Sequence, residues 1–213
     1  MNYFCSDQHL FHTNIIKYCN RPFDSVDHMN EEILNRWNEK ITDNDTVYIV
    51  GDFALGKKEK AAEWLSKANG KKVLILGNHD RSPKTMKEIG FDEVHYNLEL
   101  TTENNERWLL SHFPLPLDLI RSYKRLIHGH HHSGPVSTGK RVNVCSDLWN
   151  FYPASEKEIQ ALPFQEEKTK LETWAKFDID GKMLTIDANI PYNELDGFIQ
   201  EIKIKLYSEG KNK

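Results

Sequence analysis

The chain has 213 residues and a formal net charge of -4 at pH 7, from 28 Lys and Arg residues against 32 Asp and Glu residues. A chain of this length can bury a substantial core as one domain, and its acidic balance excludes a global positive field that would hold long stretches of nucleic acid. The 3 cysteines lack C-x-x-C spacing, the N-terminus lacks a signal pattern, and no apolar run approaches membrane-spanning length. We therefore expect a soluble, cytoplasmic protein.

Short β-branched and aromatic runs that end abruptly in polar residues or glycine predict strands that feed loops at one edge of a sheet. The clearest are residues 3–6, 46–50, 72–76, 107–111 and 125–128. Between the first two runs, apolar residues recur at helical spacing from Val26 to Trp37, and a second amphipathic segment precedes the turn signal Asn69-Gly70. This alternation predicts parallel crossovers early in the chain, a more β-rich second half, and an α/β fold.

The sequence changes character towards the C-terminus. Asp180-Gly181 stands between two β-prone segments, which predicts a hairpin. Pro191 fits the first turn of a final amphipathic helix. We therefore predict a core of residues 1–160 and an extension of residues 161–213 that holds the hairpin and the helix and packs on the same domain.

Short motifs with metal-ligand chemistry stand at the ends of the expected strands. In chain order they are Asp7-Gln8-His9, Gly51-Asp52, Gly77-Asn78-His79-Asp80, Ser111-His112 and Gly129-His130-His131-His132. In open α/β sheets, the ligand crevice lies at the carboxyl ends of the strands. Carboxylate, amide and imidazole donors in this mixture suit manganese, iron or zinc. Each motif alone is common, but their joint occurrence in this order predicts a metal site.

The spacing within the motifs has a physical reason. Residues two apart on an extended chain project to the same side, so Asp7 and His9 can bind a single ion, as can His130 and His132. Glycines at these turns permit unusual dihedral angles or a close backbone approach. They are Gly51, Gly77 and Gly129.

The motif series D-x-H, G-D, G-N-H-[DE], H and G-H-x-H resembles that of the calcineurin-like metallophosphoesterases. Residues 6–23 look like the opening of a subgroup of small bacterial and phage phosphoesterases, and residues 147–153 look like its closing segment. The resemblance covers about residues 1–160. It implies an α/β/β/α sandwich of two sheets and hydrolysis of phosphomonoesters or phosphodiesters.

Carried over position by position, the resemblance implies two metal ions that share the carboxylate of Asp52. The ligands of one ion would be Asp7, His9, Asp52 and His132, and those of the other would be Asp52, Asn78, His112 and His130. Two divalent ions about 3.5–4 Å apart lower the pKa of a bridging water and clamp the phosphate oxygens. The resulting hydroxide is the nucleophile, and the net positive charge of the centre attracts phosphate despite the acidic protein.

His79 neighbours a ligand without being one, which makes it the candidate to protonate the leaving oxygen or to stabilise transition-state charge. The alternative is a loop histidine that is only hydrogen-bonded. In many family members a polar side chain three residues after the bridging aspartate orients this histidine, and that position here is Leu55. The acid role of His79 therefore requires a partner from elsewhere. Asp80 is expected to brace its own loop.

Further residues are candidates for contact with substrate. His12, Asn14 and Arg21 follow the first ligands, where they could reach a phosphate or a ribose, although exposed loop polarity explains each of them as well. Trp149 could form part of a wall on which a base stacks, although an aromatic residue near a strand end commonly belongs to the core.

We expect a dinuclear hydrolase of a nucleotide or another small phosphoester, with manganese favoured over iron, nickel or zinc and no membrane partner. The acidic balance disfavours extended nucleic acid. A nuclease is the alternative among enzymes, and a catalytically silent binding module is the alternative outside them. The presence of every ligand position and of His79 argues against the silent module, whereas Leu55 and the unmatched extension favour it.

Overall fold

A computed structural model describes residues 1–164, 174–179 and 182–187. The chain divides into two compact units, Met1–Glu166 and Glu167–Lys213. All of the motifs above lie in the first unit. The division falls a few residues after the predicted end of the core at residue 160.

In the second unit, β11 (Trp174–Ile179) pairs antiparallel with β12 (Lys182–Asp187). This is the pairing that a hairpin turn at Asp180-Gly181 requires. The final helix predicted from Pro191 onwards lies outside the described residues. The packing of the extension on the core stays a prediction.

The first sheet of the larger unit has 5 strands in the order β10-β1-β2-β3-β4. The strands are β1 (Asn2–Cys5), β2 (Thr46–Val50), β3 (Lys71–Ile75), β4 (Glu93–His95) and β10 (Ala154–Ser155). β1 to β4 run parallel, and β10 is antiparallel to β1. The predicted parallel crossovers are confirmed, with the first and third predicted strands displaced by one residue.

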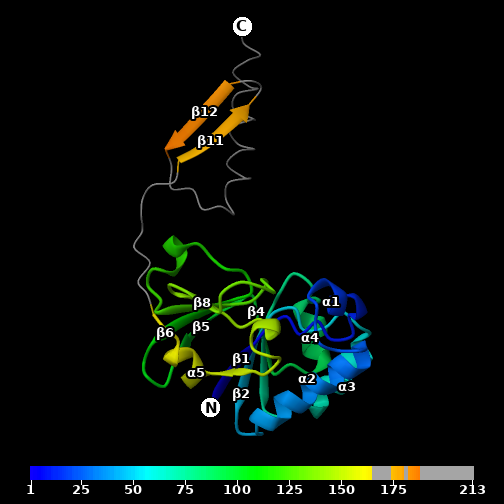
Figure 1. The fold of residues 1–213 in the computed structure, drawn as a ribbon. Helices are drawn as coiled ribbons and strands as arrows, with labels where there is room; N and C mark the ends of the chain where they lie inside the picture. Colours follow the sequence, from blue (N-terminus) through cyan, green and yellow to red (C-terminus); the bar gives the residue numbers. More distant parts are fainter. Residues whose placement is uncertain (165–173, 180–181, 188–213) are drawn as a thin grey trace. The chain divides into compact units, whose positions relative to one another are not determined.

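Helices cover one face of this sheet. They are α1 (Thr13–Tyr18), α2 (Val26–Lys40), α3 (Lys58–Lys67) and α4 (Pro83–Ile89). Figure 1 shows α2, α3 and α4 on the same side of the strands. The hydroxyl of Ser25 caps α2 by accepting the N–H of His28, and α3 ends just before Gly70, which has a φ of 83°. Both predicted helices are confirmed.

The second sheet also has 5 strands, in the order β5-β6-β7-β9-β8. The strands are β5 (Asn97–Thr101), β6 (Arg107–Ser111), β7 (Arg125–His128), β8 (Ser137–Thr138) and β9 (Arg141–Asn143). β6, β7 and β9 run parallel, and the two edge strands are antiparallel to their neighbours. The expected β-rich second half is therefore a second mixed sheet.

The strands bury alternate side chains on opposite faces, which produces separate layers of core. On the first sheet, Leu74 packs with the helices while Phe4 and Ile75 face the second sheet. Trp108 of the second sheet fills the same intersheet core and has no exposed surface. The α5 helix (Glu156–Ala161), which begins with a capping box, closes one end of this core.

The predicted sandwich of two sheets with helices is therefore confirmed. On the outer face of the second sheet, the described residues supply a 3-10 turn, η1 (Leu117–Ile120), rather than a long helix, and it packs on Leu109 and Leu126. Among the described residues, no helix has the length and apolar character needed to cross a bilayer.

Candidate metal centre

The predicted ligands follow the ends of β1, β2 and β3 in the first sheet and of β6 and β7 in the second. The two sheets are joined at this edge by a parallel bridge between Ser6 and Cys145. The N–H of Ser6 donates to the carbonyl of Val144 at 3.0 Å, and the N–H of Ser146 donates to the carbonyl of Ser6 at 3.0 Å. Strand ends from both sheets therefore meet at one place.

One group of donor atoms gathers around the carboxylate of Asp7. His132 Nε2 lies 3.6 Å from Asp7 Oδ1, and His9 Nε2 lies 3.9 Å from the same oxygen. His9 Nε2 is also 3.7 Å from Asp52 Oδ2. The structure thus brings together the four residues that the resemblance assigns to one ion.

A second group shares Asp52 with the first. His112 Nε2 lies 3.4 Å from Asp52 Oδ2 and 3.0 Å from Asn78 Oδ1. His130 Nδ1 lies 3.1 Å from the same Asn78 oxygen. Asp52 therefore stands between the two groups, as a bridging carboxylate would.

These spacings fit divalent ions. Donor atoms bonded to one ion at about 2.1 Å, at angles between octahedral and tetrahedral, lie about 3.0–3.4 Å apart. The observed separations run from 3.0 to 3.9 Å, so only small movements would close the groups around ions. Asp7 Oδ1 is buried without a hydrogen-bond partner among the described residues. An orphaned carboxylate oxygen that faces two imidazoles is the arrangement a cation would complete.

The orientation of His112 leads to the same conclusion. Its Nδ1 lies 2.9 Å from the carbonyl of Val50, which can only accept, so Nδ1 is the donor. Nε2 faces two acceptors, Asn78 Oδ1 and Asp52 Oδ2. Without a bound ion, a proton on Nε2 satisfies them, and Asp52 raises the pKa of His112 despite its burial. A cation bound to the neutral ring would take the place of that proton.

Burial and neighbouring charges shift the pKa values of the candidate ligands in different directions. Burial raises the pKa of Asp7, and the hydroxyl of Ser6 only partly offsets it. Burial acts in the same direction on Asp52, but the hydrogen bond and charge of His112 outweigh it and lower the pKa. Burial lowers the pKa of His9 to about 3, so its ring is neutral near pH 7, which is the form that binds metals.

The backbone at the ligands differs from the extended chain that the sequence suggested. Asp7, His9, Asp52 and His130 have φ values of 55°, 50°, 57° and 69°, in the left-handed region that costs about 1–3 kcal/mol for such residues. The sequence expectation was wrong because loop hydrogen bonds override the strand period. The N–H of Asp7 donates to Gly51 and that of His9 to Asp52.

Each glycine of the motifs makes room for a ligand. A Cβ at Gly77 would lie 2.3 Å from Asp52 Oδ1, and one at Gly129 would lie 2.4 Å from Asp7 Oδ2. Gly51 has a φ of 89°, and a Cβ there would lie 2.2 Å from His112 Nδ1. Close approach is thus the reason for all of these glycines, and unusual dihedrals are a second reason only at Gly51.

Asp80 braces more than its own loop. Its carboxylate accepts the N–H groups of Gly77, Asp52 and Phe53 at 2.9, 2.9 and 3.0 Å. These contacts tie the loop after β3 to the loop after β2. Asp80 therefore fixes the position of the shared ligand Asp52.

Residues 3–154 match the family described as calcineurin-like phosphoesterase. The chain belongs to the calcineurin-like phosphoesterase family. The match covers the whole candidate centre and ends at the first residue of β10.

Relatives of this phosphoesterase-family chain occur in archaea and phages. An uncharacterized protein of Methanocaldococcus jannaschii is 36% identical over 162 residues, which cover 72% of this chain and 85% of the relative. The gene 66 protein of Mycobacterium phage L5 is 29% identical over 181 residues, which cover 69% of this chain and 86% of the relative. A solved protein of unknown function from Aquifex aeolicus has a TM-score of 0.65 and 28% identity, covering 75% of this chain and 97% of that chain.

His79 lies beside the first group of ligands. Its N–H donates to Asp52 Oδ1 at 2.8 Å, and its exposed ring has its centroid 5.4 Å from that of His9. Leu55 cannot orient the ring, and the residues described here supply no hydrogen bond to it. The need for another partner for His79 therefore persists.

The candidates for substrate contact fall in different environments. His12 is half-buried with its ring centroid 5.8 Å from that of His9, whereas Asn14 is exposed in the first turn of α1. Trp149 donates its indole N–H to the carbonyl of Asn143 at 2.8 Å and packs on the intersheet core. For Trp149, the core alternative describes these contacts better than a stacking wall does.

Arg21 needs a different interpretation from the one its position suggested. Its side chain has no exposed surface, and its Nε, Nη1 and Nη2 all donate within the protein. A fully buried guanidinium with these partners is not available to a substrate phosphate. The predicted contact of Arg21 with substrate is therefore wrong, and the side chain instead links parts of the protein interior.

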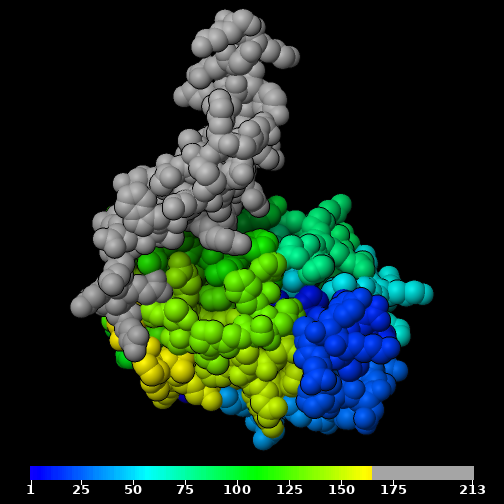
Figure 2. Space-filling view, turned by 45° about the horizontal axis from the view of Figure 1, so that its top comes forward, coloured from blue at the N-terminus to red at the C-terminus, as the bar shows by residue number. Residues whose placement is uncertain are grey.

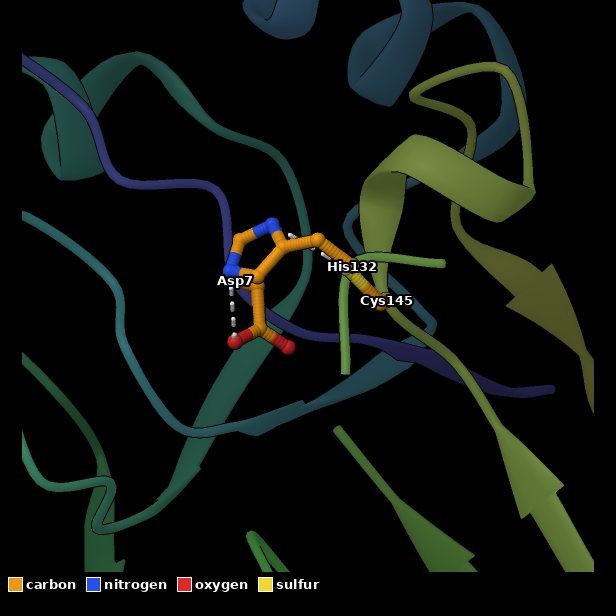
Figure 3. A group of neighbouring side chains, drawn as sticks. All are labelled: Asp7, His132 and Cys145. Carbon is orange, nitrogen blue, oxygen red and sulfur yellow. Dashed lines mark hydrogen bonds and ion pairs between the residues drawn. The ribbon is translucent and has the colours of Figure 1, made fainter. Parts of the chain in front are cut away.

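The sequence interpretation missed Asp147, which lies in the 3-10 turn η2 (Ser146–Leu148). Its Oδ2 lies 2.8 Å from His132 Nδ1 and 3.4 Å from Cys145 Sγ. Figure 3 shows Cys145 on one side of His132, whose other ring nitrogen is directed at Asp7. The sequence signal that could have identified Asp147 is its position as a carboxylate shortly after a strand end, which the other ligand motifs share.

Proposed function

We propose that this phosphoesterase-family chain is a dinuclear, metal-dependent hydrolase of phosphoesters. The observation that carries the proposal is the placement of Asp52 between two groups of donors, together with the orphaned oxygen of Asp7. Manganese is our first choice of metal, because the donors are carboxylate, amide and imidazole; iron, nickel and zinc accept the same set.

Asp7, His9, Asp52 and His132 would hold one ion, and Asn78, His112 and His130 would hold the other together with Asp52. When bound, the two ions activate a water molecule and neutralise charge on the phosphate. The chain itself contributes preorganisation, since its hydrogen bonds and glycines hold the ligands before substrate arrives.

His79 is placed to serve the leaving group. Its ring is exposed and lies next to His9, so a phosphoester at the centre would meet it. A proton held on this ring could pass to the departing oxygen. Because no described residue hydrogen-bonds to the ring of His79 and fixes its orientation, we expect His79 to contribute at the lower end of the usual range for an acid catalyst.

The proposed substrate is a nucleotide or another small phosphoester, either a monoester or a diester. The net charge of -4 gives no general attraction to a polyanion, so the local charge of the centre has to attract the phosphate. A nuclease remains the alternative among enzymes. The silent binding module is the alternative outside them, and the apolar Leu55 is the feature that favours it.

The test is hydrolysis of a chromogenic phosphodiester and the matching phosphomonoester by metal-stripped protein refilled with Mn²⁺. Turnover of either ester that depends on the added ion supports the proposal and narrows the substrate class. If Mn²⁺ binds but neither ester nor a panel of nucleotides is cleaved, the binding module becomes the better explanation. Cleavage of long single-stranded or duplex DNA in preference to nucleotides would favour the nuclease.

His79→Ala is expected to lower kcat by about 10²-fold, because a positioned proton donor contributes about 10²–10⁴-fold, while Mn²⁺ binding stays within twofold of wild type. Single-turnover rates and Mn²⁺ titrations measure the two quantities separately. His28→Ala, at an exposed histidine on α2, is the matched control and should leave both unchanged. Unchanged kcat in His79→Ala would remove the acid role and return His79 to a loop residue.

A further inference from the structure

We infer that Asp147 and Arg21 form a positioning pair for His132 and thereby set the affinity of only one of the two ion sites. The inference rests on the proposed function in that it presupposes the metal centre. It concerns residues outside every ligand motif, and the ion affected would be the one that Asp7, His9, Asp52 and His132 hold.

The first step is the bond between Asp147 and His132. Their Oδ2 and Nδ1 atoms lie 2.8 Å apart, and the guanidinium of Arg21 donates to both oxygens of Asp147, which makes the carboxylate the acceptor in the bond with His132. A carboxylate can only accept, so Nδ1 carries the hydrogen, and in the neutral ring, the form that binds a metal, Nε2 keeps its lone pair. That lone pair is on the side of Asp7 Oδ1, 3.6 Å away. Asp147 thus selects the tautomer, fixes the ring and makes the imidazole a stronger donor.

The second step is the clamp that Arg21 places on Asp147. The Nε and Nη2 atoms of Arg21 donate to the two carboxylate oxygens of Asp147 at 2.9 and 2.8 Å and form a bidentate pair. The same guanidinium donates to the carbonyls of Gln8 and Asp7, both at 2.7 Å. Arg21 therefore connects the loop of the first ligands, with its left-handed backbone, to the residue that orients His132.

This connection joins distant parts of the chain. Residues 21 and 147 lie far apart in sequence, and Figure 2 shows the N-terminal region in blue against the segment after β7 in yellow-green on one face of the molecule. The side chain of Asp147 is 8% exposed, and that of Arg21 is fully buried. Removal of one partner would leave the other buried without its opposite charge, so the pair acts as a unit.

Among the residues that the structure describes, no carboxylate supports any of the other ligand histidines in this way. Nδ1 of His112 donates to the neutral carbonyl of Val50, and Nδ1 of His9 is buried with no partner within the described part of the chain. His130 directs Nδ1 itself at Asn78 in the second group of donors, and no carboxylate among the described residues bonds to its other ring nitrogen. The two ion sites are therefore supported unequally. Loss of Asp147 should weaken the site that contains His132 and spare the site that contains His112.

A competing interpretation is that Cys19, His132 and Asp147 themselves bind a thiophilic metal, since their donor atoms lie within 4.8 Å of one another. Arg21 argues against it. Both oxygens of Asp147 already accept from the guanidinium, so a cation there would meet a buried positive charge. The cluster is better explained as support for His132 than as a separate metal site.

The test compares Mn²⁺ titrations of metal-stripped wild type, Asp147→Ala, Asp147→Asn, Arg21→Ala and Arg21→Lys, with free Mn²⁺ followed by electron paramagnetic resonance. Asp118→Ala is the matched control, because Asp118 also pairs with an arginine but is exposed. We expect Asp147→Ala to weaken one of two sites by about 10–100-fold, the usual effect of removing a residue that supports a ligand, with the other within twofold. Asp147→Asn should weaken it less, since the amide oxygen still accepts.

Arg21→Lys should recover part of the affinity lost in Arg21→Ala, because lysine keeps the charge but not the bidentate geometry. Thermal unfolding identifies any variant that fails to fold, and the isosteric Asp147→Asn then carries the comparison. Two sites of wild-type affinity in folded Asp147→Ala, or equal weakening of both sites, would overturn the inference. If Asp147→Ala weakens one site but the wild type cleaves no ester, the inference is supported and the proposed hydrolase is refuted. If the wild type takes up no Mn²⁺, both are refuted.

Discussion

Asp52→Asn is expected to lower kcat/KM for a phosphoester by more than about 10³-fold, beyond the 10–100-fold typical of residues that only support a ligand. Asp52 is 2% exposed, and its Oδ2 faces both His9 and His112 while Oδ1 accepts the N–H of His79. The substitution keeps the shape of the side chain but removes the charge shared by both groups of donors. Both ion sites should therefore weaken.

Kinetics with the better ester and Mn²⁺ titration measure the two consequences of Asp52→Asn. The control is Asp43→Asn, which removes the same charge from an exposed loop and should change neither quantity. Circular dichroism should be unchanged, because asparagine fits the same space. Retained activity together with two Mn²⁺ sites of wild-type affinity would show that Asp52 is not the shared ligand.

Gly51→Ala is expected to impair both stability and metal binding. A Cβ at Gly51 would lie 2.2 Å from His112 Nδ1 and 2.8 Å from the Cα of Gly77, so backbone or a ligand must move. Such overpacking costs about 1–3 kcal/mol of unfolding free energy, in addition to about 1 kcal/mol of strain at a φ of 89°. Displacement of His112 should weaken Mn²⁺ binding by about 10-fold or more.

Gly134→Ala separates these contributions. Gly134 has a φ of 100°, and a Cβ there would meet nothing within 4 Å, so this variant carries the strain without the clash. Urea unfolding of the two metal-free variants should show that Gly51→Ala loses more stability, and only Gly51→Ala should lose Mn²⁺ affinity. Equal losses in both variants would mean that backbone strain, and not the space beside His112, is the reason for glycine at position 51.

The sequence predicted most of the strands near the centre because they are buried, short and followed by polar loops. The period of apolar residues from Val26 to Trp37 also determines the helix on the first sheet, since one of its faces must be buried. Where prediction failed, the decisive contacts were not local. Asp7 and His9 are left-handed because their N–H groups donate to the loop after β2, which lies more than forty residues along the chain.

By itself, the sequence determined which chemical groups this protein offers and the strand ends on which they stand, because binary pattern and motif spacing are local properties. Only the tertiary structure decided how those groups are supported. It placed Ser6 beside Cys145, buried Arg21 against Asp147, and set Asp147 behind His132. These contacts depend on how the ends of two sheets meet, and their hydrogen bonds join residues that no short-range pattern connects.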